Sequence, residues 1–254
     1  MISYPALSPS FPVFQPINPL SSTDPKAISQ PFYQQANSNL GKPFDLQMIP
    51  ASPIIPGQPG WLDLQVYNPV TGAPPRLQIV HEKPAHIFIV NQDLSDFQHV
   101  HPEAMQPGLM RIPVNFKAPG TYKLFIQFTT PENGEQTLNK PFQVGSVQPS
   151  QKPMVPDAYL PKFVDGYTFR VTGLPIRQNS MSMFHVEVSQ NGMPVKNIQP
   201  YLGAGAHGVI ISQDSQSFIH THPMSEPQNG LYHSPIMFHT QIDRPGLYKM
   251  WIQT

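Results

Sequence analysis

Hydrophobic residues in this chain form short runs separated by turn-forming residues. Within the runs, Val, Ile, Leu, Phe, Tyr and Thr alternate with polar residues over about four to eight positions, the pattern of a strand with one buried face. Pro, Gly, Asn and Asp stand between the runs, where they favour turns and interrupt helices. The pattern predicts an all-β fold.

The runs locate the expected strands in both halves of the chain. In the first half we expect them near residues 44–49, 61–67, 77–80, 86–90, 97–101, 110–116, 122–128 and 142–144. In the second half we expect them near residues 167–172, 183–189, 207–212, 218–222, 234–242 and 247–253. Short strands separated by such turn-forming residues are typical of an immunoglobulin-like or cupredoxin-like β-sandwich.

An internal repeat relates the two halves. Residues 86–102 (HIFIVNQDLSDFQHVHP) match residues 207–223 (HGVIISQDSQSFIHTHP) at a constant offset of 121. A second block, residues 118–127 (APGTYKLFIQ), matches residues 244–253 (RPGLYKMWIQ) at an offset of 126. A solenoid repeats every 20 to 50 residues or so, so this longer period indicates two copies of a whole domain.

The repeat sets the domain boundaries. We expect a leader rich in Pro, Ser and Gln over residues 1–40, a first β-sandwich over 41–147, a linker over 148–156 and a second β-sandwich over 157–254. The leader has too few apolar residues to offset its ordering entropy, so we expect it to be disordered unless it docks on something. The first copy continues into a final strand over residues 140–144 that the second copy lacks. Such an open sheet edge usually has to be covered.

Composition excludes several function classes. The 254 residues carry 15 basic and 15 acidic side chains without a run of Lys or Arg, so we expect no nucleic-acid or anionic-membrane surface. No apolar run approaches the roughly 20 residues of a transmembrane segment. Residues 1–20 lack the basic and apolar regions of a signal peptide. The chain has no Cys for a disulfide or a thiolate metal site.

Three histidines recur in both copies. They are His86, His99 and His101 in the first copy and His207, His220 and His222 in the second. His99 and His101 are two positions apart on an expected strand, so both point to the same face. If Val90 pairs with Phe97 in a hairpin, the antiparallel register places His101 across from His86, with Cβ atoms about 5 Å apart.

Three imidazoles on one face suit Zn(II) or Cu(II), with a further position for water, carboxylate or thioether. Candidates for that position are Glu103 and Met105 in the first copy and Met224, Glu226, His233 or His239 in the second. The 11 Met residues add an argument for copper, because thioethers favour Cu(I), although methionine is also an ordinary core residue. This hypothesis predicts one ion per domain and weaker binding below about pH 6.5, where imidazole protonates.

A structural role for the histidines is the alternative. A slip of one residue in the hairpin would put His86 on the opposite face. A His-x-His pair can also hydrogen-bond loop carbonyls, and Phe88, Val90 and Phe97 give the histidine face the character of a core. His81 and His185 have no counterpart in the repeat, and we interpret them as surface or packing residues.

Three segments carry a family resemblance: residues 93–102 (DLSDFQHVHP), residues 201–204 (YLGA) before His207, and residues 245–251 (PGLYKMW). They resemble uncharacterised bacterial secreted or periplasmic domains and are similar in pattern to YtkA-like and copper-resistance β-sandwich proteins. The likeness covers residues 60–130 and 165–254. It implies an immunoglobulin-like fold, an extracytoplasmic location, either periplasmic or secreted, and a link to metal homeostasis.

Two functional hypotheses follow. The chain has no Gly-x-Ser-x-Gly elbow, phosphate-binding glycine loop, His-Glu-x-x-His motif or dinucleotide fingerprint. We therefore expect a non-enzymatic module that binds or carries copper or zinc, with copper redox chemistry as the enzymatic alternative. The second hypothesis is an interaction or adhesion protein, in which the histidines only pack and a protein partner binds the open edge or the leader.

Overall fold

The structure, a computed structural model, describes residues 39, 41–51, 53–146, 152–157 and 161–254. The described part is all-β and forms two compact units with a boundary between Lys152 and Pro153. The prediction of an all-β fold with two β-sandwich domains is thus confirmed. The leader predicted over residues 1–40 lies outside the described residues apart from Asn39.

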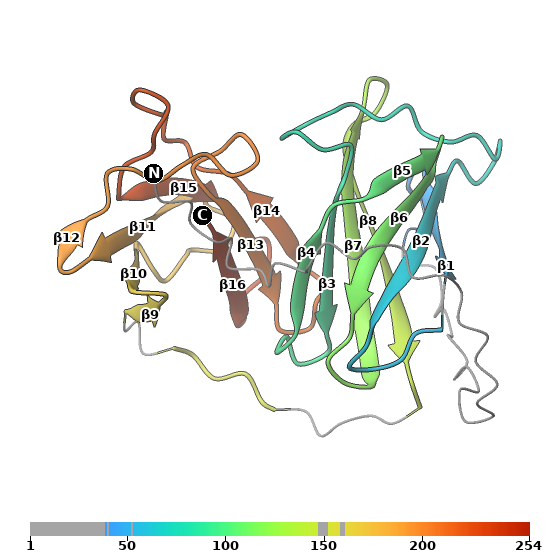
Figure 1. Cartoon of the computed structure of the whole chain (residues 1–254), viewed down its shortest axis with the longest axis horizontal. Helices are drawn as coiled ribbons and strands as arrows, with labels where there is room; N and C mark the ends of the chain where they lie inside the picture. The colour runs from blue at the N-terminus through green and yellow to red at the C-terminus, as the bar shows by residue number, and fades with distance from the viewer. Residues whose placement is uncertain (1–38, 40, 52, 147–151, 158–160) are drawn as a thin grey trace. The chain divides into compact units, whose positions relative to one another are not determined.

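The first unit is a sandwich of two four-stranded antiparallel sheets (Figure 1). One sheet has the order β1 (Asp45–Pro50), β2 (Pro59–Tyr67), β6 (Leu109–Asn115), β5 (Glu103–Gln106). The other has the order β4 (Phe97–Val100), β3 (His86–Asn91), β7 (Gly120–Thr130), β8 (Gly134–Val144). Alternate apolar residues of both sheets meet in one core, among them Leu62, Leu64, Ile87 and Ile89.

The described part of the second unit also has eight strands, divided into sheets of five and three. Its larger sheet contains β9 (Lys162–Val164), β10 (Tyr167–Thr172), β11 (Ser182–Gln190), β12 (Met193–Pro194) and β15 (Ile236–Thr240), with β15 paired to β11. Its smaller sheet has the order β14 (Phe218–Thr221), β13 (His207–Ser212), β16 (Tyr248–Gln253). Phe184, Val186, Ile210 and Phe238 lie in the core between them.

The second repeated block forms the same corner in each unit. Tyr122 at the start of β7 donates a hydrogen bond from its hydroxyl to the Ala118 carbonyl at 2.9 Å, and Tyr248 at the start of β16 donates one to the Arg244 carbonyl at 2.8 Å. A tyrosine bonded to backbone a few residues upstream is the tyrosine corner of β-sandwich proteins. After these corners, β7 pairs with β3 and β16 pairs with β13 in equivalent registers. His86 lies across from Gln127 in the first unit, and His207 lies across from Gln253 in the second.

The structure corrects several strand predictions. Residues 77–80 form no strand, although Gln78 and Val80 make isolated bridges. The strand expected at residues 142–144 begins at Gly134, because the whole of β8 pairs with β7. The pattern missed the short strands β5, β9 and β12. Within the described residues, β16 lies at the edge of its sheet, at the position where β7 pairs with β8 in the first unit.

None of the described residues forms a helix long and apolar enough to cross a membrane.

Candidate metal centres

The hairpin between β3 and β4 has a loop that fixes its register. The Asp93 carboxylate accepts a hydrogen bond from the Ser95 amide at 3.0 Å, and Leu94 between them has φ of 57°. An Asx turn with a left-handed residue of this kind reverses the chain at a defined position. The β13–β14 loop repeats it, with the Asp214 carboxylate accepting from the Gln216 amide at 3.0 Å and Ser215 at φ of 55°.

The resulting register brings the histidines together as predicted. Val90 is paired with Phe97 and Ile87 with Val100, so one further step places His86 across from His101. In the second unit Gly208 is paired with Thr221. The same step there places His207 across from His222.

The histidines occupy the face of each sheet that points away from the sandwich core. Ile87, Ile89 and Val100 belong to the core, so their neighbours His86 and His99 lie on the opposite face. His99 stacks on Phe88 with ring centroids 4.3 Å apart, which holds its ring in place. Both His86 and His99 are only 5% exposed, so water has little access to them.

Three ring nitrogens of the first unit converge on one point. The Nδ1 atom of His86 lies 3.3 Å from Nε2 of His99 and 3.1 Å from Nε2 of His101. Around a tetrahedral Zn(II) with Zn–N bonds of about 2.0–2.1 Å, neighbouring nitrogens are about 3.3 Å apart. The spacing of the three rings is therefore that of ligands around one ion. Of the described acidic residues, none joins this group.

A backbone contact orients the first of these rings. The other ring nitrogen of His86, Nε2, lies 3.4 Å from the carbonyl oxygen of Val80. When Nε2–H donates to this oxygen, Nδ1 keeps its lone pair and faces the other two rings. Metal-binding histidines in proteins are commonly oriented by such a carbonyl.

Val80 begins the tight turn that supplies this carbonyl. The backbone groups of Val80 and Lys83 exchange two hydrogen bonds, with His81 and Glu82 at φ of 50° and 64°. Tyr201 and Ala204 form the corresponding turn in the second unit.

The second unit repeats the arrangement of rings. The ring centroids of His207 are 5.5 Å from His220 and 4.7 Å from His222, and those of His220 and His222 are 4.4 Å apart. The corresponding separations in the first unit are 5.5, 4.9 and 4.7 Å. The angles between the ring planes also agree, at 28°, 89° and 64° against 36°, 85° and 60°. The first triad is a group that can hold a metal ion, and the second triad repeats its ring arrangement.

Two rings of the first triad have lowered pKa values. Burial, opposed by the Val80 carbonyl, lowers the pKa of His86 to about 4. Burial together with the neighbouring His99 and His86 lowers the pKa of His101 to about 2. Because only a neutral imidazole can bind a metal through its lone pair, no proton has to leave these two rings near pH 7.

The family described as "Domain of unknown function (DUF8832)" matches residues 44–146 and 162–254. The chain belongs to this family. Both matched segments contain a complete histidine hairpin, so each half of this DUF8832 protein carries its own triad.

Other comparisons add little to the family assignment. No curated protein matches the chain. A solved structure titled "Structural basis for the promiscuous specificity of the carbohydrate-binding modules from the beta-sandwich super family" is similar over 82% of this chain and 95% of its own, at 13% identity and a TM-score of 0.22. A likeness this slight supports no inference about ligand.

The candidate additional ligands in this DUF8832 protein lie outside the four strands of the two histidine hairpins. Glu103 and Met105 are exposed on β5, which belongs to the sheet opposite the triad. Met224 and Glu226 are exposed after β14, and His233 lies in the connection before β15. His239 lies on β15 of the larger sheet. Whether any of them supplies a further ligand stays a prediction.

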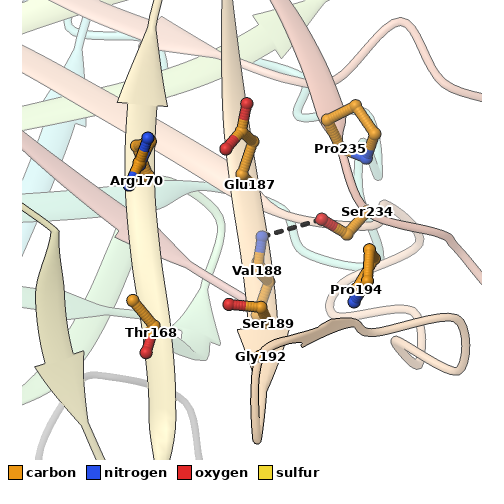
Figure 2. Close-up of a pocket in the computed structure, with 9 residues that line it drawn as sticks. All are labelled: Thr168, Arg170, Glu187, Val188, Ser189, Gly192, Pro194, Ser234 and Pro235. Carbon is orange, nitrogen blue, oxygen red and sulfur yellow. Dashed lines mark hydrogen bonds between the residues drawn. The ribbon is translucent and has the colours of Figure 1, made fainter.

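A hollow of about 400 Å³ lies on the second unit of the DUF8832 protein. Figure 2 shows its polar lining on neighbouring strands, with Arg170 of β10 beside Glu187 of β11 and Ser234 accepting a hydrogen bond from the Val188 amide at 2.8 Å. It contains no histidine and no aromatic residue. None of the triad histidines therefore lines this hollow.

Proposed function

We propose that each unit of the protein binds one Zn(II) or Cu(II) ion through its three histidines. The ligands are His86, His99 and His101 in the first unit and His207, His220 and His222 in the second. The observation that carries the proposal is the convergence of Nδ1 of His86 with Nε2 of His99 and of His101 at 3.1 and 3.3 Å. The same ring arrangement in the second unit supports it independently.

The geometry favours a metal site over a purely structural cluster. Histidines that only pack usually direct their nitrogens to separate carbonyl or side-chain partners. Here the nitrogens of three rings face one another, and the known carbonyl contact of His86 uses its opposite nitrogen. Three neutral nitrogens without a thiolate leave one position for water or an exchangeable ligand. We infer a protein that binds or carries the ion, not one that uses it for catalysis.

We further propose that the protein acts in the cell envelope or the secreted space. The likeness of its hairpin segments to YtkA-like and copper-resistance β-sandwich proteins supports this location. The absence of Cys from the sequence is compatible with it.

Calorimetric titration of the metal-free full chain with ZnCl₂ and with CuCl₂ tests the proposal. We expect two ions per wild-type chain, one in the His99→Ala/His101→Ala variant and one in the His220→Ala/His222→Ala variant. Gln47→Ala/Gln65→Ala is the matched control, because these two exposed residues are paired on β1 and β2 in the other sheet of the first unit, and it should retain both ions. Absence of binding tighter than about 10 μM in the wild type would remove the proposal.

A further inference from the structure

The larger sheet of the second unit carries a cluster of Met and His side chains on its outer face. In the pairing of β11 with β15, Met183 lies across from His239 and His185 across from Met237. Phe184 and Phe238, between them, are fully buried in the core. Because side chains alternate along a strand, all four residues point away from the core.

Their register places the four side chains next to one another on that face. Cross-strand partners have Cβ atoms about 5 Å apart, and residues two apart on one strand are about 7 Å apart. The Cβ atoms of the four residues therefore form a small rectangle. Met183 and Met237 are at two diagonal corners, and His185 and His239 are at the other two. Met183 is 47% exposed, so an ion can reach the cluster from solvent.

A third thioether adjoins the rectangle. Pro223 bridges Phe238 in antiparallel fashion, and the Met224 amide donates a hydrogen bond to the Met237 carbonyl at 2.9 Å. The next step of this register places Met224 beside Met237 on the same face. Met224, considered above as a ligand of the histidine triad, thus belongs beside the Met–His cluster.

The cluster is a property of the second unit and not of the fold. In the first unit β2 and β6 correspond to β11 and β15. At the position of His185 and Met237 they carry Asp63 and Arg111, whose charged groups form two hydrogen bonds of 2.7 and 2.8 Å. The first unit thus has an ion pair at the position where the second unit has His185 and Met237.

We propose that Met183, His185, Met237 and His239 bind a soft monovalent ion, Cu(I) or Ag(I), with Met224 as an adjoining thioether. Thioethers select Cu(I) among biological metals, and a set of neutral donors suits a single positive charge. Glu187, two residues after His185 on the same face, lies across from Arg170 beside the hollow of Figure 2. The four residues include none of the six triad histidines, although the register that places Met224 beside Met237 also places His222 of the second triad beside His239.

Silver nitrate is the probe for the test, in chloride-free buffer with the full chain labelled at its Met methyl groups. We expect Ag(I) to shift the NMR signals of the Met183 and Met237 methyls first. The Met183→Leu/Met237→Leu variant should bind about one Ag(I) fewer, or bind it at least about tenfold more weakly. Leu nearly conserves the volume of Met, so the fold should be retained.

Two exposed methionines outside the cluster provide the matched control. Met105 lies on β5 and Met193 on β12, and the Met105→Leu/Met193→Leu variant should bind Ag(I) as the wild type does. Equal shifts of all exposed Met methyls, or unchanged binding in Met183→Leu/Met237→Leu, would overturn the proposal. Both Met→Leu variants should bind the same number of Zn(II) ions as the wild type. Failure of the Ag(I) site is therefore distinguishable from failure of Zn(II) binding at the histidine triads.

Discussion

Two buried histidines make the metal-free first unit sensitive to acid. In the folded unit the pKa of His86 is lowered to about 4 and that of His101 to about 2, whereas both are near 6.5 in an unfolded chain. Below about pH 6.5 the unfolded chain therefore takes up protons that the folded unit does not. The stability contributed by these neutral rings is fully present above about pH 6.5 and is lost as the pH falls towards 4.

We expect the unfolding free energy of the first unit to decrease between pH 7 and pH 4.5 by about 2–3 kcal/mol for each of these histidines. The measurement is urea unfolding of EDTA-treated protein, followed by Trp61 fluorescence in a Trp251→Phe background. The His86→Gln/His101→Gln variant should lose most of this dependence. An unchanged pH profile in that variant would show that other groups cause it.

Gly173 is required by the close approach of two strands. It has φ of +89°, and a Cβ atom there would lie 2.6 Å from the Met183 carbonyl oxygen. Gly166 has a similar φ of +84° but open space at that position. Gly166→Ala should cost about 1 kcal/mol of left-handed strain, and Gly173→Ala a further 1–3 kcal/mol from the clash. Urea unfolding monitored by Trp251 in a Trp61→Phe background measures both, and equal losses would contradict this account.

At the scale of the elements, each tyrosine corner should stabilise its own unit. Tyr122→Phe and Tyr248→Phe each remove one hydrogen bond to a carbonyl, with an expected loss of about 1 kcal/mol in the affected unit. Trp61 and Trp251 fluorescence report the two units separately, because each unit contains one of the two Trp residues. A loss in the unit that was not mutated would be the contrary result.

The register of the histidine hairpin was predictable from sequence, because residues close together in the chain determine it. The spacing of Val90 and Phe97 around an Asp-containing loop is sufficient to set the register, and the repeat gives the same answer twice. The face that carries the core was not predictable in the same way. All central residues of β3 are apolar (HIFIVN), so no alternation distinguishes the face of Ile87 and Ile89 from the face of Phe88.

The sequence pattern did not predict the elements that depend on partners far away in the chain. The first half of β8 reads GEQTLN and forms a strand because β7 supplies hydrogen-bonding partners along its whole length. Residues 77–80 are apolar enough for a strand but make only isolated bridges. The Met–His cluster requires β11 to pair with β15, more than 40 residues later in the chain, and sequence alone does not give the register of such a distant pair.

At the scale of the whole molecule, two separate triads predict two separable metal effects. A ligand at 100 times its dissociation constant adds about 2.7 kcal/mol to the stability of the unit that binds it. For a domain of about 100 residues this raises the melting temperature by on the order of 10 °C. We expect Zn(II) to raise the melting temperatures of both units in the wild type.

In the His99→Ala/His101→Ala variant, Zn(II) should stabilise only the unit reported by Trp251, in a Trp61→Phe background. The reciprocal His220→Ala/His222→Ala variant should show stabilisation of the unit reported by Trp61 alone. Loss of the zinc effect from both units in either variant would mean that the triads do not bind independently.

Each proposed histidine triad, together with the tight turn that precedes it, lies within one continuous stretch of chain, residues 80–101 in one unit and 201–222 in the other. A duplication that copies this stretch and its loop copies all three ligands in register, without any compensating change in the opposite sheet. This stretch of chain can therefore be transferred to another protein as one segment. Transplanted into an unrelated sandwich with a matching strand pair, it should carry its affinity for metal with it.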